Sequence, residues 1–399
     1  MIGSQRDAHR PKSRPEMRLR RINAALMLLA CCTTVNADNK SANPAAPALA
    51  SGITAPHHTA TGFKNNYTGP INKTFGDLIR WQRERQAAGL PKPPGAPTPT
   101  MAPDLATIKA YASTPQAASP GRPAITWIGH ASMLVQAGGL NVLTDPIFSH
   151  RASPVSLIGP ERKHPPGLQL ADLPVVDVVL ISHNHYDHLD RPSVLEIASR
   201  SNTAGKPTLF IVPLGMKSWF ADMGIENAVE LDWWDKHIHK GVEFNFTPLQ
   251  HWSARTFSDR SQTLWGAYAV FAPDLHWYFA GDTGYSKDFA DTRARFTDRH
   301  TEARGGGFDL ALLPIGAYQP RWFLAEQHID PAEAVQIHRD LGAKRSVGIH
   351  WGTFELSDES LDQPPKDLAL AANAQGLKEG DFRVMAIGET RLIPPRPKP

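Results

Sequence analysis

The chain has 399 residues, of which 41% are hydrophobic and 20% are charged, and its mean hydropathy is -0.34. These values exclude a fully disordered chain and a polytopic membrane protein, and they leave a globular protein with a large core. The formal net charge is +3, but residues 1–37 alone carry seven basic and two acidic residues. The rest of the chain is therefore slightly acidic, which argues against nucleic acid as a partner.

Residues 1–37 are typical of a secretory leader. A basic run ends at Arg21, an apolar run follows over residues 22–30, and Val35 to Ala37 resemble a signal-peptidase site. Cys31 offers an alternative, a lipoprotein signal in which this cysteine is acylated, and a short buried helix is a third interpretation. We therefore predict a signal peptide or lipoprotein leader and an exported protein, either periplasmic or lipid-anchored to a bacterial envelope. Because Cys31 and Cys32 are the only cysteines, any metal in the mature protein would be held by nitrogen and oxygen.

Residues 38–119 are rich in Ala, Pro and Thr, which predicts a linker or a segment that wraps over the surface. One amphipathic stretch, residues 75–90, interrupts this segment. It offers Phe75, Leu78, Ile79 and Trp81 for docking on the main body. The same stretch is more charged than a membrane-inserting helix. Docking on the main body and peripheral contact with a membrane therefore both stay open.

The main domain is predicted to span residues 120–399, where short apolar runs are separated by Gly, Pro and Asp. The clearest helix runs from Asp330 to Leu341, because Asp330 can cap it, Pro331 suits its first position and Glu333 completes a capping box. Early strands come as hairpins and later strands alternate with helices, which predicts mixed sheets covered by helices. The expected strands are 124–128, 133–136, 141–144, 175–181, 209–212, 242–248, 264–271, 276–280, 310–314 and 345–349.

The most informative stretch follows the apolar run at residues 178–181 and has the spacing H-x-H-x-D-H. It places His183, His185, Asp187 and His188 within six residues. A loop after a strand can turn the first two histidines toward one ion and the last two residues toward another. The motif therefore predicts two bound metals.

Two ions need more ligands than four, and an anionic bridge is needed to hold them together. His251, Asp282 and His350 each follow an apolar run that is expected to be a strand. This repeated placement is what a site assembled on one rim of a sheet requires, because strand ends fix the ligand geometry.

Several blocks of the chain together resemble one family. With the H-x-H-x-D-H motif they make residues 120–395 similar to the metallo-β-lactamase-fold hydrolases, and more closely to the family of phospholipases D that hydrolyse N-acylphosphatidylethanolamine. The resemblance implies an α/β fold with mixed sheets in a four-layer αββα sandwich. The blocks are Trp127–Ala131, Leu143–Ser149, Ile181–Asp190, Glu230–Trp234, Gln250–Trp252, Ala280–Tyr285, Pro314–Tyr318, Pro320–Phe323, Gln327–His328 and Ile349–Thr353.

The resemblance also implies roles for individual residues. His183, His185 and His251 would bind a first zinc, and Asp187, His188 and His350 a second, with Asp282 as the bridge. His328 would stand near the substrate phosphate. Iron or manganese stays an alternative to zinc, because a His/Asp site admits each of them.

The implied activity is phospholipase D-type hydrolysis of N-acylphosphatidylethanolamine-like glycerophospholipids by a metal-bridging hydroxide. It releases phosphatidic acid and an N-acylethanolamine-type alcohol, and a metal-bound water, Asp187 or His328 protonates the leaving oxygen. The catalytic residues would be Asp187, Asp282 and His328. A lactonase, or another ester or phosphodiester hydrolase, is the alternative on the same site, and a non-catalytic binding protein that keeps the fold is a further one. A homodimer is left open.

The remaining histidines and two aspartates are expected outside the ligand set. Asp145 and Asp190 are interpreted as residues that orient ligands or cap helices. A lone histidine is usually an ordinary core or surface residue, and this interpretation is applied to His130, His150, His164, His237, His239, His276, His300 and His338.

Overall fold

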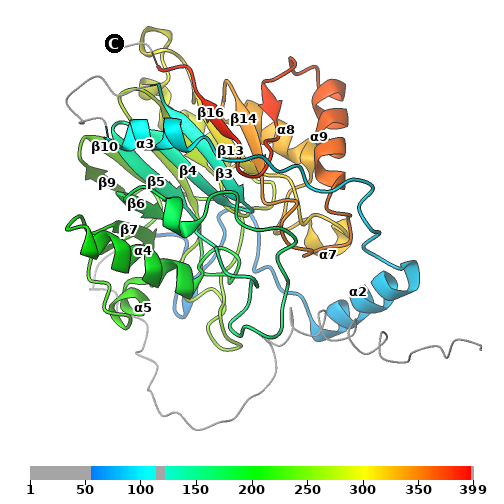
Figure 1. The fold of residues 1–399 in the computed structure, drawn as a ribbon. Helices are drawn as coiled ribbons and strands as arrows, with labels where there is room; N and C mark the ends of the chain where they lie inside the picture. The colour runs from blue at the N-terminus through cyan, green and yellow to red at the C-terminus, as the bar shows by residue number, and fades with distance from the viewer. Residues whose placement is uncertain (1–54, 114–121, 397–399) are drawn as a thin grey trace, which may run out of the picture.

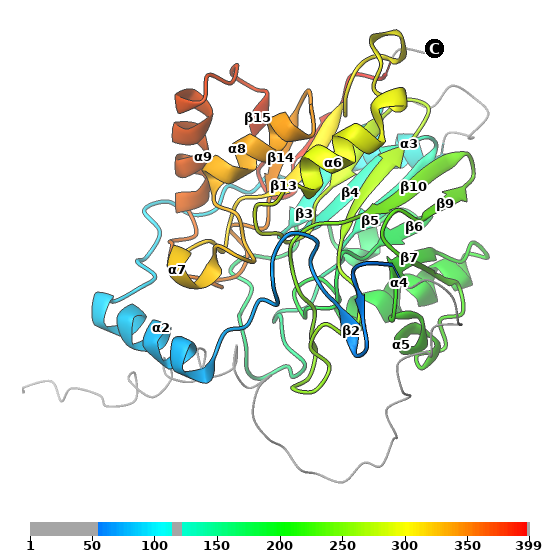
Figure 2. The ribbon, with the colours of Figure 1, turned by 180° about the vertical axis from the view of Figure 1, so that it is seen from behind.

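The computed structural model describes residues 55–113 and 122–396. The predicted leader, with Cys31, lies outside the described residues. In the described part, two seven-stranded sheets are stacked face to face and helices cover their outer surfaces (Figures 1 and 2). A separate short hairpin is formed by β1 (His58–Thr59) and β2 (Gly62–Phe63).

The first sheet has the strand order β16-β3-β4-β5-β6-β7-β8. The pairs from β16 to β5 are antiparallel, and the pairs from β5 to β8 are parallel. The strands are β3 (Ala124–Gly129), β4 (Ser132–Ala137), β5 (Leu140–Thr144), β6 (Val178–Leu180), β7 (Leu209–Pro213), β8 (Ala228–Leu231) and β16 (Thr390–Leu392).

The second sheet has the strand order β15-β14-β13-β12-β11-β10-β9. Its pairs from β9 to β12 are antiparallel, and those from β12 to β15 are parallel. The strands are β9 (Lys236–His239), β10 (Val242–Thr247), β11 (Ala267–Phe271), β12 (His276–Phe279), β13 (Leu310–Pro314), β14 (Ser346–Ile349) and β15 (Phe382–Arg383).

Helices complete the outer layers on both sides. The first sheet is covered by α3, α4 and α5, and the second by α6, α8 and α9 (Figures 1 and 2). The helices are α2 (Phe75–Ala88), α3 (Leu105–Ser113), α4 (Arg191–Thr203), α5 (Lys217–Ala221), α6 (Asp288–Arg295), α7 (Arg321–Leu324), α8 (Pro331–Asp340) and α9 (Gln363–Ala374), with single 3₁₀ turns at Leu170–Asp172, Thr297–Arg299 and Glu302–Arg304.

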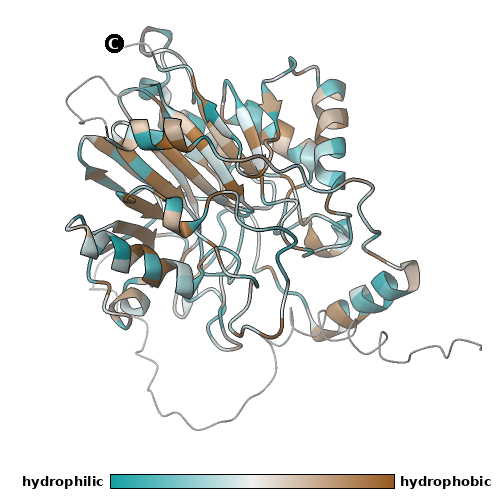
Figure 3. Cartoon of the chain, in the orientation of Figure 1, coloured by the Kyte–Doolittle hydropathy of each residue, from teal (hydrophilic) through white to brown (hydrophobic). Residues whose placement is uncertain are grey.

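The main core lies between the two sheets. Trp127 and Met133 of the first sheet are fully buried in one cluster with Phe246 and Tyr268 of the second. The strands are accordingly mostly brown to white in Figure 3, whereas the covering helices alternate between teal and brown. This layering of helices, sheet, sheet and helices confirms the predicted mixed α/β sandwich.

Two helices test the local interpretation of the sequence. Helix α8 has the predicted capping box, in which the Asp330 side chain accepts from Glu333 N. Helix α2 buries Trp81, which is 2% exposed, but Phe75 is 63% exposed, so the prediction that Phe75 docks on the body is wrong. Phe75 is the first residue of the helix, one turn before the residues that pack on Phe323 and Leu324.

Among the described residues, no helix is both long and apolar enough to cross a bilayer.

Candidate metal centre

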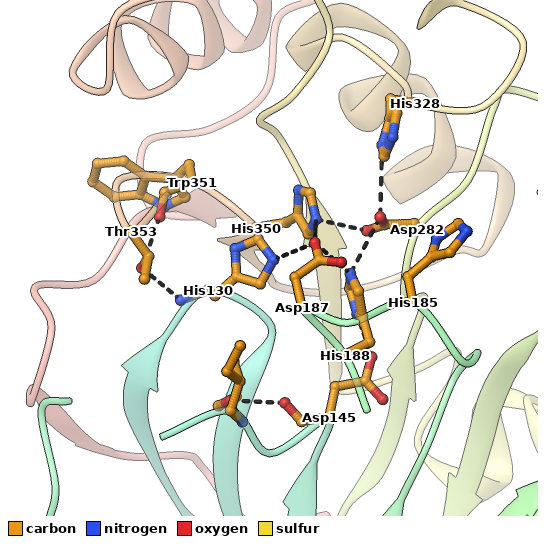
Figure 4. A network of polar contacts seen from close by, with 12 residues as sticks. His130, Asp145, His185, Asp187, His188, Asp282, His328, His350, Trp351 and Thr353 are labelled. Atoms are coloured by element: carbon orange, nitrogen blue, oxygen red, sulfur yellow. Dashed lines mark hydrogen bonds and ion pairs between the residues drawn. The ribbon is translucent and has the colours of Figure 1, made fainter. Parts of the chain in front are cut away.

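Side chains from both sheets meet at the ends of four strands. Loops that follow β6, β10, β12 and β14 carry them, and Figure 4 shows most of them pointing toward one another. All of the predicted ligands come together there, although they span almost half of the chain. They are His183, His185, Asp187, His188, His251, Asp282 and His350.

The first three histidines form one compact group. His183 Nε2 lies 2.8 Å from His185 Nδ1, and His251 Nε2 lies 3.4 Å from the same His185 nitrogen. His183 and His251 are both 1% exposed. Three imidazole nitrogens thus converge in one place, as three donors to a single ion would.

Asp187, His188 and His350 form a neighbouring group. Asp187 Oδ2 lies 3.3 Å from His188 Nε2 and 3.4 Å from His350 Nε2. Asp282 contacts the same two histidines, with Oδ2 at 3.2 Å from His188 Nε2 and Oδ1 at 3.1 Å from His350 Nε2. Its direct contacts are therefore with the second group, while His328 Nδ1 approaches Asp282 Oδ2 at 3.7 Å from another side.

These separations fit a metal better than they fit hydrogen bonds. Ligand atoms at about 2.0–2.1 Å from a tetrahedral ion are ~3.3 Å from one another, close to the contacts of 3.1 to 3.4 Å found here. His188 Nε2, His350 Nε2 and Asp282 Oδ1 are buried and have no hydrogen-bond partner in the described residues. Buried polar atoms that converge without bonding one another suit a cation. The residues present therefore fit a metal centre made of nitrogen and oxygen donors.

Outer partners fix which ring nitrogen faces the centre. His188 Nδ1 lies 2.6 Å from Asp145 Oδ2, and His251 Nδ1 lies 2.9 Å from the carbonyl of Gln327. Each contact leaves the Nε2 atom to face the other donors, which is the usual way in which ligand histidines are oriented. Asp145 thus lies where an orienting residue was expected. Asp190 precedes α4 but makes no side-chain cap there; it accepts from Ser149 instead.

Backbone geometry also brings the loops close together. Gly281, just before Asp282, has φ +68, and a Cβ at this position would lie 2.5 Å from Ser182 Cβ. A side chain would therefore push the loop after β12 away from the loop after β6. Glycine is required here both for its left-handed conformation and for this close approach.

Burial and charge divide the cluster electrostatically. Burial lowers the pKa of His185 and of His251 to about 3, so both rings are neutral at physiological pH. Burial opposes the charged form of His350 as well, but Asp282 and Asp187 outweigh it and raise the pKa of His350 to about 9. Burial would raise the pKa of Asp282, yet His188 and His350 hold it well below its usual value. The first group, with neutral histidines, can therefore bind a cation directly. In the second group, the charges of Asp187 and Asp282 are balanced by histidine charge in the absence of metal.

The structure corrects one interpretation of the sequence. The expectation that His130 is an ordinary histidine is wrong, because it is 1% exposed and its Nε2 lies 2.9 Å from Asp187 Oδ2. The signal was available, since His130 follows the apolar strand β3 as His350 follows β14. The other histidines in that set lie outside the groups that meet at this centre.

A second feature was not foreseen at all. Asn65 lies in the segment expected to be a linker, is 5% exposed, and accepts from His251 N and from Trp265 Nε1, both at 3.0 Å. His57 and His58 tie the same segment to Asp232, at 2.7 and 2.8 Å. The N-terminal segment thus supports the centre from outside.

Comparison with known proteins agrees with this geometry. A family model described as a beta-lactamase superfamily domain matches residues 140–351, which include every predicted ligand. The chain is 37% identical over 276 residues to N-acyl-phosphatidylethanolamine-hydrolyzing phospholipase D 1 of Caenorhabditis elegans, covering 66% of this chain and 74% of that protein. It is 38% identical over 262 residues to the mitochondrial N-acyl-phosphatidylethanolamine-hydrolyzing phospholipase D of Saccharomyces cerevisiae, covering 64% of this chain and 53% of that protein.

A solved structure shows the same fold at low identity. It is an isothiocyanate hydrolase from Delia radicum gut bacteria, with a TM-score of 0.50 and 19% identity, covering 68% of this chain and 99% of that one. The fold, the converging His/Asp cluster and the family match lead to one conclusion: the chain belongs to the β-lactamase superfamily and is a metallo-β-lactamase-fold hydrolase.

Proposed function

We propose that this hydrolase is a dinuclear, zinc-dependent phosphodiesterase of the phospholipase D type. Its substrates would be N-acylphosphatidylethanolamine-like glycerophospholipids, and its products phosphatidic acid and an N-acylethanolamine-type alcohol. The observation that carries the proposal is the coincidence of two donor groups at one strand rim with 37–38% identity to two proteins named for this reaction. The fold alone would not select a substrate, because it serves hydrolases with other names.

The ligands are assigned to the two ions by the group in which each one lies. His183, His185 and His251 would hold one ion, and Asp187, His188 and His350 the other, with Asp282 between them. When bound, two such ions would activate a water and polarise the phosphoryl oxygen of a diester. The chain itself orients the donors and keeps them buried, since Asp282 is 3% exposed.

His328 is the best placed residue to move a proton. Burial lowers the pKa of His328 to about 3, so its ring is neutral and carries one proton at physiological pH. Its Nδ1 is buried, has no hydrogen-bond partner in the described residues and lies 3.7 Å from Asp282 Oδ2. The attacking water would pass a proton to the neutral His328 ring as its oxygen bonds phosphorus. The bond from phosphorus to the alcohol oxygen would break, and the His328 imidazolium would return that proton to this oxygen.

Asp187 is less suited to proton transfer. Its Oδ2 atom is surrounded by three imidazole nitrogens at 2.9, 3.3 and 3.4 Å. His188 and the hydrogen bond from His130 hold the pKa of Asp187 well below its usual value, against the opposing effect of burial. A carboxylate held in this way serves as a ligand, and we assign the proton to His328.

A labelled-water experiment tests the proposal. Purified full-length protein with a measured zinc content is incubated in ¹⁸O-water with N-acylphosphatidylethanolamine, a soluble phosphodiester and a lactone. We expect the label in phosphatidic acid and none in the alcohol, with loss of turnover after chelation. Hydrolysis of the lactone alone would favour the lactonase alternative, and turnover that survives complete removal of metal would refute the mechanism.

Export is proposed separately from the leader sequence. Amino-terminal sequencing of the protein recovered from its native cells would test it. A mature terminus near residue 38, or an acylated Cys31, agrees with export. An intact leader in the mature protein contradicts it.

A further inference from the structure

His130 lies at the metal centre, and the mechanism above gives it no role beyond its contact with Asp187. It sits in the tight turn between β3 and β4, where the strand pairing is irregular between Trp127 and Gly129. Its φ is +54, a left-handed conformation that is unfavourable for a residue with a side chain. Strain of this kind at a buried site is a reason to look for a function.

The His130 side chain bonds a single carboxylate oxygen. Its Nε2 is 2.9 Å from Asp187 Oδ2, in hydrogen-bond geometry. The same oxygen is 3.3 Å from His188 Nε2 and 3.4 Å from His350 Nε2, and neither of those nitrogens has a hydrogen-bond partner among the residues that the structure describes. Three imidazoles therefore surround one oxygen, but they do so in two different ways.

An ionised carboxylate oxygen can only accept, so the proton of the hydrogen bond to Asp187 Oδ2 must come from His130 Nε2. Atoms bound to one tetrahedral ion lie ~3.3 Å apart, which matches the contacts of Asp187 with His188 and His350. The contact from His130 is shorter and directed like a hydrogen bond. A ring nitrogen that carries the proton of a hydrogen bond cannot also ligate a metal, so the Nε2 of His130 is a donor to the ligand and is not itself a ligand.

The His130 backbone holds a second member of the same group. His350 N donates to the His130 carbonyl at 3.0 Å, and His130 N donates to Thr353 Oγ1 at 2.8 Å. The rings of His130 and His350 are 4.0 Å apart (Figure 4). The turn thus fixes Asp187 through its side chain and His350 through its main chain.

We propose that His130 is a positioning residue for the second ion: its Nε2–H holds Asp187 Oδ2 toward His188 and His350. This inference rests on the proposed two-metal function. In the described residues, no hydrogen bond or ring contact joins His130 to His183, His185 or His251. Loss of the His130 donor should therefore lower the affinity for the second ion and leave the affinity for the first ion unchanged.

The test measures zinc retention. Zinc-loaded full-length protein is titrated with a chelator of known affinity, and bound zinc per chain is followed for wild type, His130→Leu and His130→Gln. Glutamine keeps an N–H near the position of Nε2, whereas leucine keeps bulk without a donor. His338→Leu is the matched control, because His338 is 5% exposed and bonds Ser346 Oγ at 2.8 Å, away from the clustered ligands.

We expect His130→Leu to lose the ion held by Asp187, His188 and His350 at a chelator activity about 10- to 100-fold lower than wild type. The ion held by His183, His185 and His251 should be retained, which also shows that the variant is folded, and His130→Gln and His338→Leu should stay within about threefold of wild type. Equal retention in His130→Leu and wild type would overturn the inference. Equal loss in His130→Gln and His130→Leu would overturn the donor role and point to direct ligation. Fewer than two ions in wild type would instead refute the proposed function.

Discussion

Replacing Asp145 by Asn would test how far an outer partner controls metal binding. Asp145 is fully buried and its carboxylate has three close polar partners. Its Oδ1 accepts from Ser182 N at 2.7 Å, and its Oδ2 accepts from Ser182 Oγ at 2.5 Å and faces His188 Nδ1 at 2.6 Å. An amide has only one oxygen, so either orientation of the new side chain sets its NH₂ group against at least one of these donors.

The expected loss of stability follows from the hydrogen bonds that Asp145→Asn removes. A hydrogen bond to a charged group contributes about 1.5–3 kcal/mol, and a buried donor left without a partner costs about 1–3 kcal/mol. We therefore expect the free energy of unfolding of the metal-free protein to fall by about 2–4 kcal/mol. Because His188 would lose the partner that orients its ring, the affinity for the ion at His188 should fall about 10- to 100-fold.

Urea unfolding and chelator competition measure the two effects. Asp190→Asn is the matched control, since Asp190 is 5% exposed and accepts from Ser149 Oγ at 2.8 Å but contacts none of the clustered histidines. Asp190→Asn should lose stability while binding zinc within about threefold of wild type. If Asp145→Asn binds both ions as tightly as wild type, the reasoning about orientation is wrong.

Three further predictions address other parts of the centre. Asp282→Asn should abolish hydrolysis and reduce zinc content, because it removes a buried charge shared by two histidines; retention of both, by activity assay and elemental analysis, would refute the two-metal arrangement. Asn65→Ala should lower the free energy of unfolding by about 2–4 kcal/mol in urea, because it strips the acceptor from His251 N and Trp265 Nε1, and an unchanged unfolding midpoint would contradict this. In metal-free protein, burial lowers the pKa of His130 and of His251 from 6.5 to about 3. On acidification the unfolded chain therefore takes up protons before the folded protein does. The free energy of unfolding should fall by about 2 kcal/mol for each of these histidines as the pH is lowered from about 7.5 to 5. Urea unfolding at a series of pH values measures this, and a free energy of unfolding that rises on acidification would contradict the sign.

The inner strands were predictable and the edge strands were not. Each of the ten predicted ranges overlaps a strand, because a strand buried on both faces reads as an apolar run. The four main-sheet strands without a prediction, β8, β9, β15 and β16, are the four edges of the two sheets. An edge strand has fewer buried positions; β9, with Lys236 and Ile238 exposed, has no apolar run to detect.

Some residues of the metal centre could be predicted from the sequence, and others depend on contacts between distant parts of the chain. The H-x-H-x-D-H spacing and the ligand types at strand ends indicated the cluster, because strand ends from stacked sheets meet at one rim. His130 follows an apolar strand as His350 does, but it was missed because a lone histidine was interpreted as an ordinary core or surface residue. Asn65 was missed because its partner His251 is 186 residues away and only the tertiary fold brings the two together.

The central claim is that this His/Asp cluster binds two cations side by side. Anomalous diffraction at the zinc edge from crystals of the zinc-loaded protein tests it directly. We predict two peaks about 3.5–4 Å apart, one beside His183, His185 and His251 and the other beside Asp187, His188 and His350. A single peak, or peaks away from these residues, would contradict it.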